Sequence, residues 1–331
     1  MHGIATIITL ATLSLSTLAM QHPSCINNDQ NSTLSALKKP TKQKAKIHFS
    51  NRKILKQQTQ EHRNNLYKIL IDNKVPKNIA KYVYKLNFLK KPTRKYKNQP
   101  EFKLKIDSYA KIFLRNIPNA QKFLQNNIDT LNAVEKKYSV NKESIVALIL
   151  MESNLGKNKG KMNVFDALFT MSHKYTSSRT KFFINELVSA FKLLASKNYF
   201  FRNNAMGSWA GAVGYVQFIP SSILAYAVDG NGDGIIDIIN NKDDAIHSAG
   251  NYLKNAKWQY NKPIMQEISK PEGDICSMIN KPYQGGKLFL AELDNERYFI
   301  VHNNHNTLLR WNRSFLFSYS VHSLSNKLKE K

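Results

Sequence analysis

The chain has 331 residues, 42% of them hydrophobic, which is enough for one large domain or two small ones with a sizeable core. Its 49 Lys and Arg residues and 23 Asp and Glu residues give a formal net charge of +26. Such a charge would attract nucleic acid, anionic lipid or an acidic wall polymer. Drift toward codons for Lys, Asn and Ile at surface positions would give the same excess of positive charge. The sequence lacks zinc-finger spacing, an RNP-like aromatic strand and a basic zipper, and so excludes the common nucleic-acid-binding modules.

Residues 1–20 are expected to be a secretory signal peptide. Ile4 to Met20 is mostly apolar, is too short to span a bilayer comfortably, and has small residues around a cleavage point near Ala19. Residues 21–50 are rich in Asn, Ser, Thr and Lys and predict an unstructured leader, so that the folded region is residues 51–331. Because no other segment is long enough to cross a membrane, we expect an exported protein.

The chain contains two cysteines, Cys25 and Cys276. Lipidation of Cys25 is one prediction, but the preceding His22-Pro23-Ser24 is a poor match to a lipoprotein cleavage site. A Cys25–Cys276 disulfide in an oxidising compartment is the other. The residues alone leave both open.

Apolar residues recur at helical spacing through most of the chain. The expected helices are 54–70, broken at Pro76; 79–86; 109–117, stopped at Pro118; 123–138; 141–152, capped by Asn141; 179–198; and 243–258. Lys90 to Lys97 is interpreted as a basic connector, and Gly207 to Pro220 as more loop than helix.

The pattern changes after Pro263. Apolar segments 288–293 and 298–301 flank Asp294-Asn295-Glu296 and predict a β-hairpin, and 315–328 predicts a closing helix. The sequence therefore predicts a mainly α protein of the α+β class, with a small strand-bearing insert near the C-terminus.

Glu152 is the strongest candidate for a catalytic residue. It follows seven consecutive apolar residues, Ile145 to Met151, a run typical of an element buried on nearly all sides. Apolar surroundings disfavour the charged form of a carboxyl group, and a neutral carboxylic acid is what acid catalysis of glycosidic cleavage requires. The alternative is that Glu152 lies on the solvent side of the last helical turn, as glutamates usually do.

A Gly-rich block, Gly207 to Ser222, is the second candidate segment. Its glycines would let the backbone approach a ligand closely, while Tyr215 and Gln217 offer a flat face and hydrogen bonds, the mixture that a sugar polymer requires. The alternative is a tight turn between packed helices.

An Asp-rich loop begins at Asp229 and has the oxygen-ligand spacing of a calcium loop. The candidate ligands are Asp229, Asn231, Asp233, the carbonyl of Ile235, Asp237 and Asp244. The twelfth position is Asn240 and not the usual bidentate Glu, so a turn without an ion is equally compatible with the pattern. The histidines lack metal-ligand spacing, and His302 and His305 are interpreted as polar loop residues.

These segments together resemble the membrane-bound lytic murein transglycosylase B family, over roughly residues 100–327. The motifs are Glu-Ser-x-x-Gly at Glu152, Gly-Ser-x-Ala-Gly-Ala-x-Gly-x-x-Gln-Phe-x-Pro-Ser-Ser from Gly207, the Asp-rich loop, and Asn304-His305 with Leu309-Arg310-Trp311-Asn312-Arg313-Ser314. The resemblance implies a lysozyme-like helical core over about 100–260, followed by the strand-bearing insert over about 263–312 and the closing helix.

The resemblance also implies a reaction. Glu152 would protonate the oxygen between N-acetylmuramic acid (MurNAc) and N-acetylglucosamine (GlcNAc), and would then deprotonate the C6 hydroxyl of MurNAc, which closes a 1,6-anhydro ring. One carboxylate would suffice because the acetamido group of the substrate replaces a protein nucleophile. Asp166 and Glu186 remain as alternative second acids.

Further roles follow from the same resemblance. Ser208 would orient Glu152, and Tyr215, Gln217 and Asn312 would contact the saccharide. No cofactor would be required beyond a structural Ca²⁺ ion at the Asp-rich loop. The protein would act as a monomer in the periplasm, on the glycan strands of peptidoglycan. If Cys25 is lipidated, the lipid would attach it to the outer membrane.

Three positions depart from the family pattern. Leu155 stands where an aromatic residue is common, and Trp311 and Phe317 stand where tyrosine is usual. Two other functions therefore stay open besides the transglycosylase: a muramidase that transfers the sugar to water, and a non-catalytic protein that binds the wall.

Overall fold

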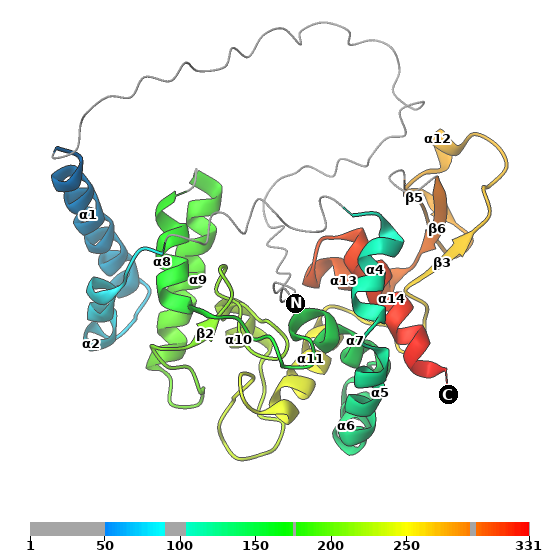
Figure 1. Ribbon diagram of the computed structural model, residues 1–331, viewed down its shortest axis with the longest axis horizontal. Coiled ribbons are helices and arrows are strands. Elements are labelled where there is room, and N and C mark those ends of the chain that lie inside the picture. The colour runs from blue at the N-terminus through cyan, green and yellow to red at the C-terminus, as the bar shows by residue number, and fades with distance from the viewer. Residues whose placement is uncertain (1–49, 90–103, 175–176, 292–295, 331) are drawn as a thin grey trace, which may run out of the picture.

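The computed structural model describes residues 50–89, 104–174, 177–291 and 296–330. It is mainly helical, with two small antiparallel sheets (Figure 1). The predicted α+β class with a helical core and a small strand-bearing insert is confirmed. The predicted signal peptide, the leader up to residue 49, Cys25 and the basic connector lie outside the described residues.

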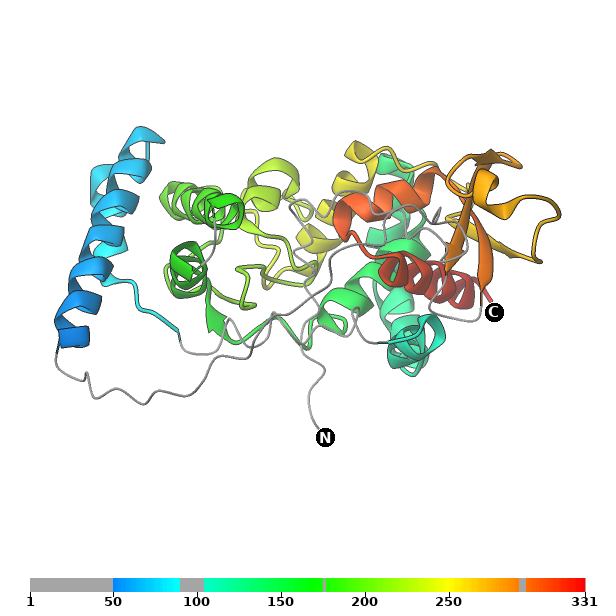
Figure 2. The same cartoon turned by 90° about the horizontal axis from the view of Figure 1, so that it is seen from above.

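The N-terminal helices form one end of the molecule. Helix α1 (Ser50–Asp72) is followed by the short α2 (Lys77–Ala80) and a 3-10 helix (Lys81–Lys85), and stands beside α8 (Val164–Lys174) and α9 (Ser177–Ala195), as Figure 2 shows. Leu66 and Leu70 of α1 are fully buried, which is what the predicted spacing of apolar residues requires.

The helical centre contains α4 (Ile106–Leu114), α5 (Ile117–Asn126), α6 (Ile128–Tyr138) and α7 (Lys142–Ser153). Every residue of α7 from Ser144 to Ser153 is buried, so the continuous apolar run does mark a helix enclosed on all sides. Pro118 was expected to end a helix, but it lies in the first turn of α5. Proline is tolerated there because the first N–H groups of a helix have no intrahelical partner.

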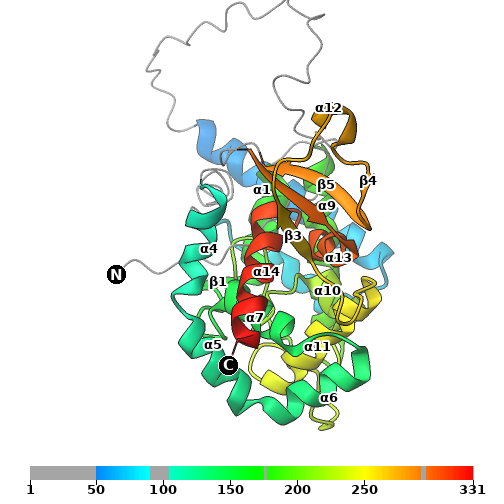
Figure 3. The same ribbon diagram turned by 90° about the vertical axis from the view of Figure 1, so that its right-hand side faces the viewer.

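Around α7 pack the elements that carry the remaining motifs. Helix α14 (Phe315–Lys329) lies beside α7 (Figure 3), and α11 (Lys242–Asn255) packs against α6. Strands β1 (Met162–Asn163) and β2 (Met206–Gly207) pair with each other and introduce the Gly-rich block, which runs as turns to α10 (Pro220–Tyr226).

The strand-bearing insert is a four-stranded antiparallel sheet at the other end of the molecule from α1 (Figure 1). Its order is β3 (Met265–Ile268), β6 (Arg297–Val301), β5 (Gly286–Ala291), β4 (Pro282–Tyr283), with the short helix α12 (Ile275–Met278) between β3 and β4. The predicted hairpin is β5–β6, in which Leu288 pairs with Ile300; the turn residues 292–295 lie outside the described ranges.

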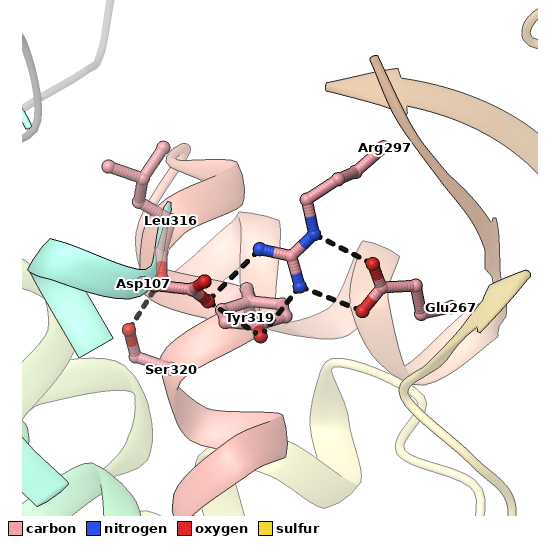
Figure 4. Close-up of polar contacts among 6 residues, drawn as sticks. All are labelled: Asp107, Glu267, Arg297, Leu316, Tyr319 and Ser320. Atoms are coloured by element: carbon pink, nitrogen blue, oxygen red, sulfur yellow. Dashed lines mark hydrogen bonds and ion pairs between the residues drawn. The ribbon is translucent and has the colours of Figure 1, made fainter. Parts of the chain in front are cut away.

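Arg297 fastens this sheet to the helices (Figure 4). Its Nε and Nη2 donate to the two carboxylate oxygens of Glu267, each at 2.7 Å, and its Nη1 donates to Asp107 of α4 at 3.0 Å. Nη2 also donates to the hydroxyl of Tyr319 on α14, at 3.1 Å. The hydrogen bonds to Glu267 raise the pKa of Arg297, so the guanidinium charge is permanent.

Helix α13 (Asn303–Trp311) contains His305, which was expected in a loop, whereas His302 directly precedes the helix. His305 is buried, with its Nδ1 and the hydroxyl of Ser318 at 2.8 Å, and burial lowers its pKa to about 4. The interpretation of His305 as a polar loop residue was therefore wrong: the ring packs among Phe289 and Phe315 as a neutral core residue.

In the described ranges no helix has the length and apolar character to cross a bilayer. Among the same residues there is no free cysteine thiol. Because Cys25 lies outside them, its pairing with Cys276 stays a prediction.

Candidate active site

Glu152 occupies the last turn of α7 and is only 5% exposed, so it does not lie on the solvent side of the helix. The helix ends abruptly because Asn154 and Leu155 both adopt left-handed backbone angles, with φ of 51° and 59°. The N–H of Leu155 returns to the carbonyl of Ile149, which closes the helix end. The strained cap leaves the carboxyl group of Glu152 at the junction of the helix with the turn.

The hydroxyl of Ser153 joins this turn to the Gly-rich block. It donates to the carbonyl oxygen of Tyr215 at 2.7 Å and accepts from the N–H of Gly156 at 2.8 Å. Gly156 has a φ of 84°, and a Cβ at this position would overlap the ring of Tyr215. The two glycine-bearing motifs, far apart in sequence, are therefore assembled into one unit.

Trp311 reaches the same junction from the end of α13. Its indole Nε1 donates to Oε1 of Glu152 at 2.8 Å, across 159 residues of sequence. The indole packs against the rings of Phe218 and Tyr252, with centroids 5.3 and 4.7 Å away. The residue that departs from the family pattern is thus a direct partner of the candidate catalytic acid.

Gln217 is held in a strained and buried conformation beside the block. Its φ of 48° is left-handed, and the residue is 6% exposed. The side-chain Nε2 donates to the carbonyl of Gly214 at 2.8 Å and approaches that of Lys159 at 3.4 Å. Its Oε1 is buried and has no hydrogen-bond partner among the described residues, which leaves one acceptor to be satisfied by a ligand or by water.

Ser208 and Asn312 are both buried near this unit. The Ser208 hydroxyl accepts from the backbone N–H groups of Ala210 and Ala212, each at 3.2 Å, and so shapes the turn of the Gly-rich block. Asn312 directly follows Trp311 at the end of α13 and is 3% exposed.

Lys159 is a feature that the sequence reading did not single out. Its Nζ lies 4.1 Å from the centroid of the Tyr215 ring, so a cation packs against one face of that ring. Burial lowers the pKa of Lys159 and raises that of Tyr215. No sequence pattern would have identified this residue, because it stands in a short loop with two other lysines, Lys157 and Lys161.

The two alternative acids serve structural purposes. Glu186 accepts from both the N–H and the hydroxyl of Ser221, at 3.0 and 2.7 Å, and so holds the start of α10. Asp166 accepts from the backbone N–H of Asn87 at 2.8 Å. Burial raises the pKa of each, while these hydrogen bonds oppose the rise.

The Asp-rich loop closes on itself through backbone hydrogen bonds. The two oxygens of Asp229 accept from Gly232 and Gly234, each at 2.7 Å, and the fully buried Asp244 accepts from Gly230 at 2.8 Å and Asp237 at 2.6 Å. Its all-oxygen donor set suits Ca²⁺. Within the described part of the chain, however, no three Asp, Glu, His or Cys residues gather as a metal site would require.

The Asp-rich loop also supports the Gly-rich block. The backbone N–H of Tyr215 donates to the carbonyl of Ile238 at 3.2 Å, and Gly214 lies so close to the same carbonyl that a Cβ there would overlap it. The loop therefore contributes to the position of Tyr215 whether or not it holds an ion.

Comparison with known proteins places these features in a family. Residues 55–326 match the family model described as Transglycosylase SLT domain, which begins earlier than the resemblance drawn from the motifs. Membrane-bound lytic murein transglycosylase B of Escherichia coli (strain K12) is 40% identical over 152 residues. That match covers 45% of this chain and 41% of the relative, so less than half of the relative's length is represented.

Solved structures are similar over most of the fold. SltB3 from Pseudomonas aeruginosa, in complex with NAG-anhNAM-pentapeptide, has a TM-score of 0.73 at 25% identity, over 82% of this chain and 80% of that one. Slt35 of Escherichia coli, in complex with calcium, has a TM-score of 0.69 at 25% identity, over 81% of this chain and 92% of that one.

Proposed function

We propose that this chain, which belongs to the Transglycosylase SLT domain family, is a lytic transglycosylase that cleaves the β-1,4 bond between MurNAc and GlcNAc in peptidoglycan. One observation carries the proposal: the buried carboxyl group of Glu152 lies where α7, the Gly-rich block and α13 meet. A buried carboxyl group beside a turn rich in glycine and aromatic side chains is the arrangement that acid catalysis on a sugar polymer requires.

In the proposed reaction Glu152 acts twice. As an acid it gives its proton to the glycosidic oxygen, and the bond from that oxygen to the MurNAc anomeric carbon breaks while the substrate's acetamido group stabilises the carbon. As a carboxylate it then accepts the proton of the MurNAc C6 hydroxyl, whose oxygen bonds to the anomeric carbon. Glu152 is restored, no water is consumed and a 1,6-anhydro end remains. The complex of SltB3 with an anhNAM-containing ligand supports this product.

Four side chains are proposed to hold the saccharide or the acid. Gln217 would present its Oε1 to a sugar hydroxyl or acetamido N–H, since that oxygen is buried without a partner among the described residues. Tyr215 would offer its ring and Asn312 its amide. Ser208 would act on Glu152 indirectly, through the shape of the Gly-rich block, and its hydrogen bonds with the N–H groups of Ala210 and Ala212 support a role in that shape.

A Ca²⁺ ion at the Asp-rich loop remains a proposal, with Asp229, Asn231, Asp233, Ile235, Asp237 and Asp244 as the ligands. The ion would have to compete with the backbone N–H groups that now donate hydrogen bonds to Asp229 and Asp244. We therefore expect weak binding that stabilises the loop and takes no part in proton transfer. Melting temperatures measured with Ca²⁺, with Mg²⁺ and with a chelator would test it: equal values in all three would contradict calcium binding.

We also propose that the protein is exported to the periplasm and acts there as a monomer on glycan strands. The apolar segment from Ile4 to Met20 supports export, and the name of the membrane-bound relative supports attachment to a membrane, for which a lipid on Cys25 is the proposed anchor. Mass spectrometry of protein from a membrane fraction would distinguish a lipid on Cys25 from a bond to Cys276.

The deciding experiment is the incubation of purified protein with peptidoglycan sacculi, followed by mass spectrometry of the released fragments. Anhydro ends support the transglycosylase. Reducing ends would show a muramidase, and the absence of fragments while the protein sediments with the sacculi would show a protein that only binds the wall.

A further inference from the structure

Trp311 and Glu152 form a hydrogen bond whose direction is fixed by chemistry. The indole N–H of tryptophan is a donor and has no acceptor capacity. Because the Nε1–Oε1 distance is 2.8 Å, Oε1 of Glu152 is always the acceptor in this contact. A tyrosine hydroxyl could either donate or accept, and so would not impose a direction.

The surrounding residues hold the indole in place. The rings of Phe218 and Tyr252 pack on it, and the hydroxyl of Tyr252 donates to the carbonyl of Arg310 at 2.8 Å, which ties α11 to the residue just before Trp311. Since Tyr252 also packs against Phe218, the three aromatic side chains form one cluster from three segments of the chain. The N–H therefore cannot turn away from Glu152 without disturbing the cluster.

We infer that Trp311 is a positioning residue that holds Oε1 of Glu152 as an acceptor, and so fixes the orientation of the carboxyl group and favours its charged form. In the neutral acid, the donor-only indole favours the carbonyl oxygen at Oε1, because a carbonyl oxygen is a better acceptor than a hydroxyl oxygen. In the carboxylate the same N–H stabilises the negative charge. This inference rests on the proposed function, in which Glu152 gives a proton and then takes another.

The consequence is that the carboxyl group keeps one orientation in both proton transfers. A carboxyl group that rotated freely would present its proton in the productive position only part of the time. The N–H donor also favours the carboxylate, which partly offsets the effect of burial. Removing the N–H should therefore change the orientation of the carboxyl group and the pH at which its proton is lost.

Other titratable groups also lie near the junction. These are Tyr215 and Lys159 beside the Gly-rich block, Tyr252 on α11 and Arg310 on α13. Burial raises the pKa of Tyr215, and that of Tyr252 to about 12, so both remain neutral from acid to mildly basic pH. Lys159, whose pKa burial lowers, is the group that could titrate at the basic end, and the variant E152Q separates it from Glu152.

The first experiment compares W311F with W258F. Trp258 is the matched control, because it is also buried and its Nε1 also donates to a side-chain oxygen, that of Asn141 at 3.2 Å, at the other end of α7. We expect W311F to move the alkaline limb of kcat/KM upward by roughly one to two pH units, because it removes a donor to the carboxylate. We also expect kcat to fall roughly tenfold with little change in KM. An alkaline limb that W311F leaves in place, or that W258F moves equally, would overturn the inference.

The second experiment does not require turnover. Tryptophan emission is titrated with pH in the unchanged protein, in E152Q and in W311F. We expect the emission of the unchanged protein to have a pH-dependent component that is absent from E152Q and from W311F, because this component requires both the indole of Trp311 and the carboxyl group of Glu152. A pH-dependent component that persists in either variant would contradict the hydrogen bond between Trp311 and Glu152. If the emission titration supports this hydrogen bond while sacculi release no fragments, the proposed function is wrong and the hydrogen bond still stands.

Discussion

The hydroxyl of Ser153 donates to the carbonyl oxygen of Tyr215 at 2.7 Å, and this bond connects the residue after the candidate acid to the centre of the Gly-rich block. Helix α7 supplies Glu152, and the block supplies Tyr215 and Gln217 as candidate sugar contacts. A single buried hydroxyl therefore sets the spacing between the acid and the surface on which a sugar would lie. The proposed subsites depend on that spacing.

Ser153→Ala is expected to destabilise the protein by about 1–3 kcal/mol, because it leaves the carbonyl of Tyr215 and the N–H of Gly156 without their buried partner. It should also lower kcat/KM, since the turn and the block lose their common anchor. Urea unfolding and kinetics on sacculi would measure both. The control is Ser189→Ala, which removes only a bond to Asn185 in its own helix and should change the unfolding free energy by less than about 0.5 kcal/mol.

Glu152→Gln is expected to lower turnover by roughly a thousandfold or more while the fold is kept, because the amide has the shape of the carboxyl group but cannot supply the proton. Melting temperature and the yield of anhydro fragments from sacculi would be measured together. Glu143→Gln makes the same chemical change in the first turn of the same helix and should leave activity unchanged. Equal activity of E152Q and the unchanged protein would remove Glu152 from the mechanism.

How much of the site could be predicted depended on how far apart in sequence the contacting residues are. The burial of Glu152 could be predicted because seven neighbouring apolar residues specify an enclosed helix. The closeness of the Gly-rich block to the turn at Gly156 followed only from the family resemblance. The bond from Trp311 could not be predicted, because 159 residues separate the partners and no local pattern aims an indole at a carboxyl group.

The fold shows the same division. The hairpin β5–β6 and the long helices carry local periodicity and were predicted. The errors arose where one residue type has two uses. Pro118 can end a helix or start one, and His305 can be a polar loop residue or a neutral core residue. Only packing against neighbours such as Phe315 decides between these uses.

Arg297→Lys is expected to loosen the four-stranded sheet from α4 and α14, because lysine keeps the charge but lacks the planar fork that binds Glu267, Asp107 and Tyr319 at once. Glu267 and Asp107 are 47% and 58% exposed, so water screens the pairs and the loss should be about 1–2 kcal/mol. Urea unfolding would measure it. The exposed Lys327–Glu330 pair is the control, and Lys327→Gln should cost less than about 0.5 kcal/mol.

His305 makes the stability of the protein sensitive to acid. Burial lowers its pKa from 6.5 to about 4, so between these values the unfolded chain binds a proton that the folded chain does not. Stability should therefore fall as the pH drops from 6.5 to 4, by up to about 3 kcal/mol, and this contribution should be constant at higher pH. Unfolding free energies measured across this interval would give the slope.

His305→Gln should reduce that slope without abolishing it, because His62 and His322 also have pKa values lowered to about 4 by burial. Glutamine keeps a polar partner for the hydroxyl of Ser318, so the variant tests the proton and not the loss of the bond. His302→Gln is the control, since His302 precedes α13 and is only partly buried. If His305→Gln and His302→Gln leave the same slope as the unchanged protein, the buried imidazole of His305 is not a source of acid sensitivity.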